Sequence, residues 1–283
     1  MAFEHIREQI DTLLAPVTDV HPLSGGDINE AYRVLLRDGR QVFVKTHASP
    51  PPKMFEVEAE GLRWLAEAGA LRVPEVLAVG ERFLALELIT AGRPAKDHAE
   101  QLGRGLARLH RAAPDGFGWA RDNFIGNLPQ DNTSEPDWPT FYVRRRLEPQ
   151  LRMAVDGGRA SSAMRELFST LFLRIERLVG PDEPPVRLHG DLWGGNCHIA
   201  RDGTPVLIDP AVYGGHREVD LAMMRLFGGF SSRTFEAYAE EWPLAPGAQE
   251  RVALYQLYPL MVHVNLFGGS YVGSVERALR SLV

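Results

Sequence analysis

Three polar residues that could do chemistry lie close together in the second half of the sequence. The segment His189–Asn196 has the sequence HGDLWGGN, which sets Asp191 and Asn196 five residues apart in a glycine-rich loop. Asp209 follows at the end of the next expected strand. Phosphoryl transfer from a nucleotide needs such a set: one aspartate orients and deprotonates the acceptor hydroxyl, while an asparagine and a second aspartate bind Mg²⁺. The H-x-D-x₄-N spacing is that of a kinase catalytic loop; an ordinary Asx-rich turn is the alternative.

Earlier in the chain, a lysine and a glutamate could form a pair that holds phosphates. Lys45 alternates with apolar residues on an expected strand, where a lysine usually points to solvent. Glu58, however, lies on the apolar stripe of the helix that follows, and a glutamate there needs a cation. Lys45 is its natural partner, and the pair would hold the α- and β-phosphates. Glu56 is the competing candidate.

Other residues are weaker candidates for binding the nucleotide or the acceptor. Gly25 and Gly26 would let backbone N–H groups approach phosphates, although a plain hairpin loop is the better interpretation of that segment alone. A nucleotide base could bind the backbone at Glu87, Leu88 and Ile89. Three side chains could contact the acceptor: Trp193, which could equally be a core residue, and His216 and Glu218, which could instead cap a helix.

Two further residues are interpreted differently. Asp220 is expected to support the catalytic loop, and His110 to make a structural hydrogen bond at a helix end. Cys197 lacks an activating partner, so a nucleophilic role is not expected.

Periodicity predicts the elements that would position these side chains. A β-rich first third is followed by a mostly helical remainder. The expected elements are a helix over 3–14, a hairpin of 31–36 with 41–45, a helix over 54–68, strands over 76–79 and 83–88, helices over 97–112, 138–154 and 161–179, a hairpin of 196–200 with 206–208, and helices within 218–283. This order predicts an α+β fold in two lobes, residues 1–89 and residues 90–283.

Composition is consistent with a cytoplasmic enzyme. The chain has 283 residues, of which 45% are hydrophobic and 24% charged, as expected for a globular protein. The longest apolar stretch, Leu257–Phe267, is too short and too polar to span a bilayer, and the first residues do not resemble a secretion signal. A single cysteine fits a reducing compartment. The net charge of −6 argues against nucleic acid as a partner.

Nine segments, taken in order, resemble the fructosamine (ketosamine-3) kinases of the aminoglycoside-phosphotransferase-like, protein-kinase-like superfamily. They are Gly25–Asn29 (GGDIN), Phe43–Lys45 (FVK), Met54–Glu58 (MFEVE), Asp122–Gly126 (DNFIG), His189–Asn196 (HGDLWGGN), Ile208–Tyr213 (IDPAVY), Gly215–Leu221 (GHREVDL), Leu226–Phe230 (LFGGF) and Val262–Gly269 (VHVNLFGG). The resemblance covers nearly the whole chain. It implies a protein-kinase-like two-lobe fold, with a small β-rich nucleotide-binding lobe and a larger helical lobe that carries the catalytic loop and the acceptor site.

The resemblance also implies an activity: ATP-dependent phosphorylation of the 3-hydroxyl of a ketosamine, on a free amine or a protein lysine, in deglycation. Asp191 would then be the catalytic base, Asn196 and Asp209 the Mg²⁺ ligands, and Lys45 with Glu58 the phosphate-anchoring pair. Residues 87–89 would line the adenine site. The alternatives are a kinase for another amine-bearing alcohol, such as an aminoglycoside or choline, and a nucleotide-binding pseudokinase.

The sequence departs from the family pattern at two places. Asp27 stands where many members carry a cysteine that can link subunits, so a monomer is expected rather than a disulfide-linked dimer. The family's Tyr-Tyr-Gly-His-Arg run is here Tyr213–Arg217 with the sequence YGGHR, which lacks one aromatic residue.

Overall fold

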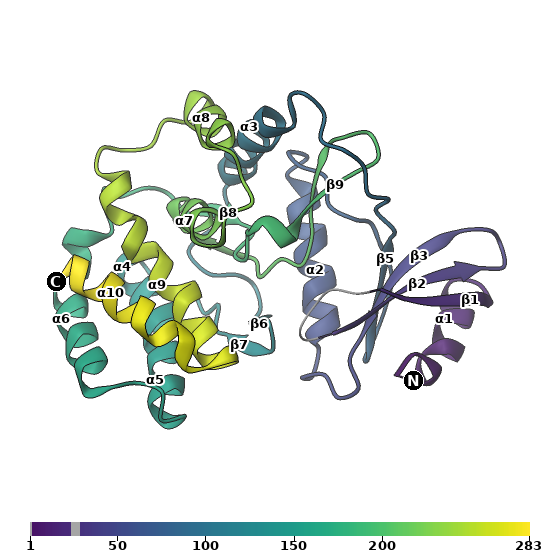
Figure 1. Ribbon diagram of the computed structural model, residues 1–283, viewed down its shortest axis with the longest axis horizontal. Helices are drawn as coiled ribbons and strands as arrows, with labels where there is room; N and C mark the ends of the chain where they lie inside the picture. The colour runs from purple at the N-terminus through teal and green to yellow at the C-terminus, as the bar shows by residue number, and fades with distance from the viewer. Residues whose placement is uncertain (1, 24–28) are drawn as a thin grey trace. The chain divides into compact units, whose positions relative to one another are not determined.

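The chain forms two compact units in the computed structural model, which describes residues 2–23 and 29–283 (Figure 1). The first unit contains Met1–His98 and Asn196–Pro210, and the second contains Ala99–Gly195 and Ala211–Val283. The sequence pattern predicts a single boundary after residue 89. Residues 196–210 nevertheless pack with the first unit, because Leu207 N donates to Arg72 O (2.9 Å) and Gly92 N donates to Ile199 O (3.0 Å).

An antiparallel sheet is the frame of the first unit. Its strand order is β1-β2-β3-β5-β4, and the two strands of the expected hairpin lie at its centre (Figure 1). Gly39, at φ +87°, makes the turn between them, a conformation that glycine adopts without strain. The strands are β1 (Val17–Leu23), β2 (Glu30–Leu36), β3 (Gln41–Thr46), β4 (Val76–Gly80) and β5 (Phe83–Glu87).

A helix covers each face of this sheet. Residues of η1 (Ala2–His5) and α1 (Arg7–Leu13) pack with Val42 and Val44 on one face, whereas α2 (Met54–Glu67) packs with β5 on the other. Since side chains alternate along a strand, Phe43 and Lys45 point to the α2 side. The alternation of β3 therefore places Lys45 beside α2. A short hairpin, β9 (Cys197–Ile199) and β10 (Pro205–Leu207), completes the first unit.

The second unit is mainly helical and contains two short antiparallel strand pairs, β6 with β7 and β8 with β11, together with isolated bridges. Its longest helix, α9, runs beside α10 and carries much of the core (Figure 1). The elements are α3 (His98–Arg111), β6 (Asn123–Ile125), β7 (Leu128–Gln130), α4 (Trp138–Phe141), the π-helical turn η2 (Tyr142–Leu147), α5 (Glu148–Asp156), α6 (Ser162–Leu178), β8 (Val186–Leu188), η3 (Gly194–Asn196), β11 (Tyr213–Gly215), α7 (Glu218–Phe227), α8 (Ser232–Glu241), α9 (Ala248–Phe267), η4 (Gly269–Tyr271) and α10 (Val272–Leu282).

Most periodic segments form the helices that their patterns predict. The exceptions are 3–14, which begins in the 3-10 turn η1, and 138–154, which contains the π-helical turn η2. In α6, the stripe of Met164, Phe168, Leu171 and Ile175 is buried in the core, as its spacing indicates. Across the described part of the chain, no helix is long and apolar enough to cross a membrane.

Candidate active site

Lys45 lies at the centre of a charged cluster in the first unit. Its Nζ forms an ion pair with Oε1 of Glu58 and donates to Oδ1 of Asp209 at 2.8 Å. Glu58 projects from the middle of α2 onto the face that contacts the sheet, whereas Glu56 is exposed. Asp209 arrives at the same lysine from the loop after β10. Three segments that are distant in sequence thus meet at one ammonium group.

In this cluster, burial and neighbouring charges shift the pKa values of Lys45 and Glu58 in opposite directions. The side chains of Lys45 and Glu58 are only 7% and 12% exposed. Burial alone would lower the pKa of Lys45, but Asp209 and Glu58 outweigh it and hold that pKa above its usual value. For Glu58, burial dominates and raises its pKa to about 7, against the lowering effect of Lys45. The cluster therefore keeps a fixed positive charge on Lys45 across the physiological range.

Asp209 occupies an unusual backbone position. Its φ is +51°, a left-handed conformation that only one other non-glycine residue of the described chain, Lys53, shares. Its side chain is 48% exposed although it bonds to a buried lysine. Asn196 is buried and lies beside this backbone: Ile208 N donates to Asn196 O (3.0 Å), and Nδ2 of Asn196 donates to Asp209 O (3.5 Å). The β9–β10 hairpin therefore brings the two candidate metal ligands together.

The structure describes only some of the residues that are predicted to bind the nucleotide. Gly25 and Gly26 lie outside the described residues. Glu87 ends β5 opposite Val42, and its carboxylate is paired with Arg72. Leu88 and Ile89 follow the strand and are half-buried. In the described chain, neither of their backbone N–H groups makes a hydrogen bond.

In the second unit, a buried carboxylate holds the backbone of the catalytic loop. Asp220 accepts hydrogen bonds from His189 N and Gly190 N, both at 2.9 Å. His110 bonds to the same carboxylate through Nε2 (3.1 Å), and its Nδ1 lies 2.8 Å from the hydroxyl of Tyr238. Burial would raise the pKa of Asp220, but these partners outweigh it and lower that pKa. An ionised Asp220 thus fixes the backbone immediately before Asp191, whose own N–H donates to Nδ1 of His189 (3.2 Å).

A second set of buried polar groups, which no pattern in the sequence indicates, holds the segment that follows Asp209. Gln130 Nε2 donates to Ala211 O (3.1 Å) and Asn123 Nδ2 donates to Val212 O (2.9 Å). Ala211 N in turn donates to His189 O at 2.9 Å. The β6–β7 hairpin therefore supports the catalytic loop from beneath.

The buried guanidinium of Arg146 anchors that hairpin. It donates to Asn132 Oδ1 (2.6 Å) and lies 3.8 Å from the ring centroid of Tyr213. The sequence marks this hairpin only through the segment Asp122–Gly126 and the polar residues that follow it. Three-residue strands and isolated amides, however, carry too little pattern to reveal their partners.

The three predicted acceptor residues differ in accessibility. Trp193 is 41% exposed, and a Cβ at Gly195 would lie only 2.2 Å from its indole, so the ring packs directly over that glycine. His216 is 2% exposed, and its ring stacks on Tyr255 with centroids 5.1 Å apart. Burial lowers the pKa of His216 to about 4. Glu218 is buried and accepts two hydrogen bonds from Arg251, at 2.8 and 2.6 Å.

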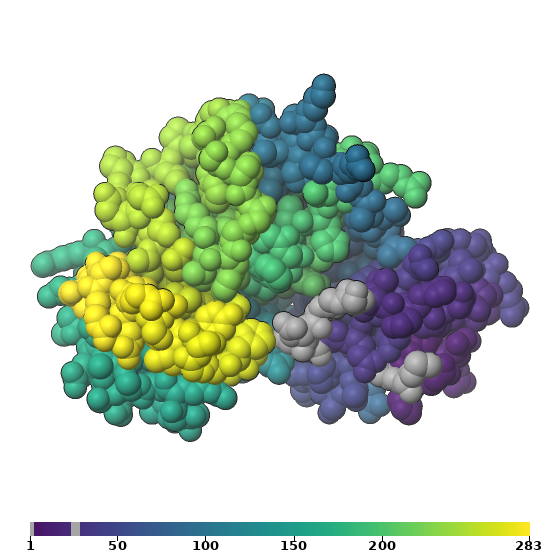
Figure 2. Space-filling view, viewed as in Figure 1, coloured from purple at the N-terminus to yellow at the C-terminus, as the bar shows by residue number. Residues whose placement is uncertain are grey.

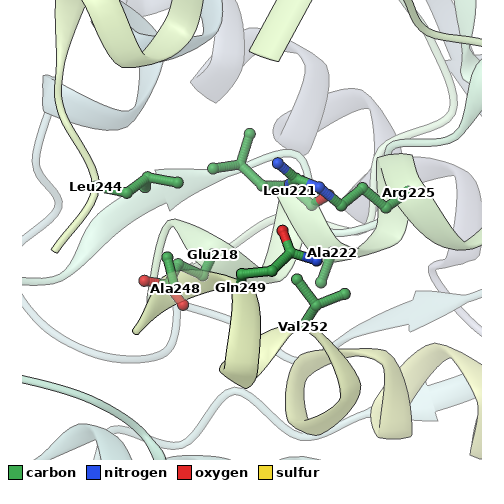
Figure 3. A pocket seen from close by; sticks show the side chains of 8 residues that line it. All are labelled: Glu218, Leu221, Ala222, Arg225, Leu244, Ala248, Gln249 and Val252. Carbon is green, nitrogen blue, oxygen red and sulfur yellow. Dashed lines mark hydrogen bonds between the residues drawn. The ribbon is translucent and has the colours of Figure 1, made fainter. Parts of the chain in front are cut away.

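Glu218 also lines a small pocket between α7 and the start of α9 (Figure 3). Its other lining residues are Leu221, Ala222, Arg225, Leu244, Ala248, Gln249 and Val252. Within residues 2–23 and 29–283, no cluster of three or more His, Cys, Asp or Glu side chains could hold a metal ion. Any metal at Asn196 and Asp209 would therefore need further ligands from a bound phosphate or from water.

Comparison of the whole fold defines the class of protein. The aminoglycoside phosphotransferase APH(2'')-Ib, solved with ADP, superposes with a TM-score of 0.66 at 15% identity, over 100% of this chain and 98% of that chain. At that identity the match shows the fold alone: a kinase-like fold with a β-sheet N-terminal region and a helical remainder, as expected.

Closer matches define the family. A structure from Thermobifida fusca YX-ER1, provisionally named fructosamine-3-kinase, has a TM-score of 0.91 and 39% identity over 98% of both chains. The chloroplastic protein-ribulosamine 3-kinase of Oryza sativa subsp. indica is 38% identical over 266 residues, which cover 91% of this chain and 77% of the plant protein. The family model described as fructosamine kinase matches residues 2–283. The chain therefore belongs to the fructosamine kinase family, which confirms the resemblance.

Proposed function

We propose that this protein transfers the γ-phosphoryl group of ATP to the 3-hydroxyl of ketosamines of the fructosamine or ribulosamine type. Membership of a kinase family supports the use of ATP, and the names of its relatives support the acceptor class. These relatives give less support to an aminoglycoside or choline-like acceptor, because the matches of that kind are similar in fold only.

One observation carries the proposal furthest: the buried Lys45 held by Glu58 and Asp209. This cluster supports nucleotide binding, and the catalytic loop with Asp191 separates a kinase from a nucleotide-binding pseudokinase. In a kinase, such a lysine offers its charge to the nucleotide phosphates while the glutamate keeps it in place. The left-handed backbone and half-exposed carboxylate of Asp209 fit a group that is held ready for a ligand.

The donor chemistry of Asn196 and Asp209 fits Mg²⁺. Both provide oxygen atoms, and Mg²⁺ is usually held by one or two carboxylates together with phosphates and water. We assign these two residues as its protein ligands. When bound, Mg²⁺ would neutralise charge on the β- and γ-phosphates.

The remaining chemistry belongs to side chains of the catalytic loop. Asp191 orients the acceptor hydroxyl and accepts its proton as transfer proceeds. Asp220 keeps Asp191 in place through the backbone of His189 and Gly190. Lys45 stabilises charge on the transferring group. Such positioning and electrostatic effects supply most of the rate enhancement in phosphoryl transfer.

The other predicted site residues take supporting roles. Gly25 and Gly26 would cover the phosphates, and the backbone of Glu87, Leu88 and Ile89 would bind adenine. Trp193 is exposed enough to stack on the acceptor. The burial of His216 and Glu218 favours an indirect role for both, as a wall behind the acceptor site.

The biological setting follows from this chemistry. Phosphorylation at the 3-hydroxyl prepares a ketosamine to break down and release its amine, so we assign the protein to deglycation in the cytoplasm. We expect a monomer without redox control. Burial raises the pKa of Cys197 to about 12, which suppresses the reactive thiolate.

A panel of acceptors tests the function. The protein would be incubated with ATP, Mg²⁺ and, separately, a ribulosamine, a fructosamine, an aminoglycoside and choline, and ADP release would be measured. We expect turnover with the two ketosamines alone. Turnover with the aminoglycoside or choline instead would favour the second kinase class, and turnover with none would favour the pseudokinase.

A further inference from the structure

Four aromatic side chains form a partly exposed cluster beside the catalytic loop. The ring of His263 contacts three others, with centroid distances of 4.5 Å to Phe227, 5.3 Å to Phe267 and 5.0 Å to Tyr271. Phe267 is 49% exposed, and the other three are half-buried. We call these four residues the aromatic cluster.

Backbone contacts tie the aromatic cluster to the loop that carries Asp191 and Trp193. Phe227 is followed by Gly228, whose carbonyl accepts a hydrogen bond from Gly194 N at 3.2 Å. The next residue, Gly229, approaches Gly194 so closely that a Cβ on it would lie 2.7 Å from Gly194 Cα. Phe227 of the aromatic cluster is therefore adjacent in sequence to a residue that bonds directly to the catalytic loop.

The electrostatics of the aromatic cluster favour a cation. Phe227 is the last residue of α7 and Phe267 the last of α9, so the negative ends of two helix dipoles lie at the aromatic cluster. One positive end opposes them, because α10 begins directly after Tyr271. Aromatic faces attract ammonium groups through their quadrupoles.

His263 adds a hydrogen-bond acceptor. Its Nδ1 lies 2.8 Å from Pro259 O, which can only accept, so Nδ1 carries the proton. Burial lowers the pKa of His263, which keeps the ring neutral and leaves Nε2 as an acceptor. Among the described residues, Nε2 has no hydrogen-bond partner.

We propose that the aromatic cluster binds the protonated secondary amine of the acceptor, together with the first carbons of the substituent on that amine. The inference rests on the proposed function, because the amine of a ketosamine is attached to C1, two carbons from the C3 that carries the reacting hydroxyl. Nε2 of His263 accepts from the ammonium group, and Phe267 and Tyr271 contact the substituent. The aromatic cluster would thus select ketosamines from neutral sugars.

The test compares two acceptors that differ in one atom. One is fructosyl-lysine, and the other is a neutral ether in which oxygen replaces the linking nitrogen. The measured quantity is the ratio of kcat/KM for the amine to kcat/KM for the ether, in the wild type, Phe267→Ala and His263→Asn. Asparagine keeps a donor for Pro259 O but lacks the ring and its second nitrogen. Leu173→Ala, which truncates a side chain that is 90% exposed on α6, is the matched control.

We expect the wild type to prefer the amine and each cluster variant to reduce the ratio about tenfold, the scale of one cation–π contact in a partly desolvated site. Leu173→Ala should keep the ratio. A ratio within twofold of the wild type in both variants would overturn the role of the cluster, and so would an equal loss on the two acceptors. Failure of the proposed function is distinct, since the wild type would then phosphorylate neither acceptor.

Discussion

At the scale of single residues, a substitution of Asp191 should impair phosphoryl transfer without impairing nucleotide binding. The substitution Asp191→Asn keeps the size of the side chain but removes the base. We expect kcat with a ketosamine to fall about 10²–10⁴-fold, while the affinity for ATP, measured by calorimetry, stays unchanged. Asp156→Asn, which alters an exposed aspartate at the end of α5, is the control and should keep full activity. Near-normal turnover in Asp191→Asn would remove this residue from its proposed role.

The burial of His216 predicts how the stability of the protein depends on pH. Because burial lowers its pKa to about 4, the folded protein does not take up the proton that the unfolded chain binds below pH 6.5. The contribution of His216 to stability is therefore complete above pH 6.5 and is lost as the pH falls towards 4. Between pH 7.5 and pH 5, the wild type should lose about 2 kcal/mol more in free energy of unfolding than His216→Gln.

Urea unfolding at several pH values would measure this difference. His198→Gln, at an exposed position on β9, should follow the pH dependence of the wild type. If His216→Gln also lost stability in parallel with the wild type, His216 would be accessible to solvent or protonated in the folded state, and a direct contact with the acceptor would regain support.

At the scale of elements, the turn from β8 into the catalytic loop depends on Gly190. Its φ is +83°, and a Cβ there would lie 2.0 Å from Ala211 O. Gly158 also has a positive φ, of +67°, but a Cβ on it would meet nothing within 4 Å. Gly158→Ala should thus cost only the backbone strain of about 1–2 kcal/mol, whereas Gly190→Ala should cost more and abolish transfer. Chemical denaturation and kcat measurements on both variants check this, and equal costs would show that the loop can adapt.

Long periodic elements could be predicted from the sequence, whereas short ones could not. The stripe in α6 and the Asp-Gly turn before β3 follow from local patterns that the rest of the chain does not override. The strands β6, β7, β8 and β11 have three residues each, too few for a periodic signal, and their pairing depends on distant segments. The segment expected as one helix over 138–154 contains the π-helical turn η2, a local change of winding that a regular period does not anticipate.

In the candidate site, too, features set by local spacing could be predicted, whereas those set by distant contacts could not. Spacing along α2 is enough to place Glu58 towards the core and leave Glu56 outside. Spacing does not reveal that Asp209 bonds to Lys45, because this contact joins residues 164 positions apart. The burial of His216 and the Arg251 partner of Glu218 were equally hidden, since both depend on how α7 and α9 pack together.

At the scale of the whole molecule, ATP and Mg²⁺ should stabilise the protein together. A ligand at about 100 times its Kd adds about 2.7 kcal/mol to the stability, which corresponds to several degrees in Tm. We expect Asp209→Asn to lose the part of the shift that depends on Mg²⁺. Asp202→Asn, in the exposed turn of the same β9–β10 hairpin, is the control and should keep it. An unchanged Mg²⁺ dependence in Asp209→Asn would count against Asp209 as a metal ligand.

The charged cluster around Lys45 and the buried carboxylate beneath the catalytic loop belong to different compact units of one chain. A kinase needs both, the first for the nucleotide and the second for the acceptor hydroxyl. A chain with only the first would fit a nucleotide-binding module. The presence of both in a member of the fructosamine kinase family is the main reason to assign an active enzyme.

The most direct test of that assignment is the position of the phosphate on the product. The protein would be incubated with ATP, Mg²⁺ and a ribulosamine, and the product analysed by phosphorus–proton correlation NMR. The proposed function predicts a phosphate on the 3-hydroxyl, followed by release of the amine. A phosphate on any other oxygen, or no product from a ketosamine under conditions where an aminoglycoside or choline is phosphorylated, would contradict it.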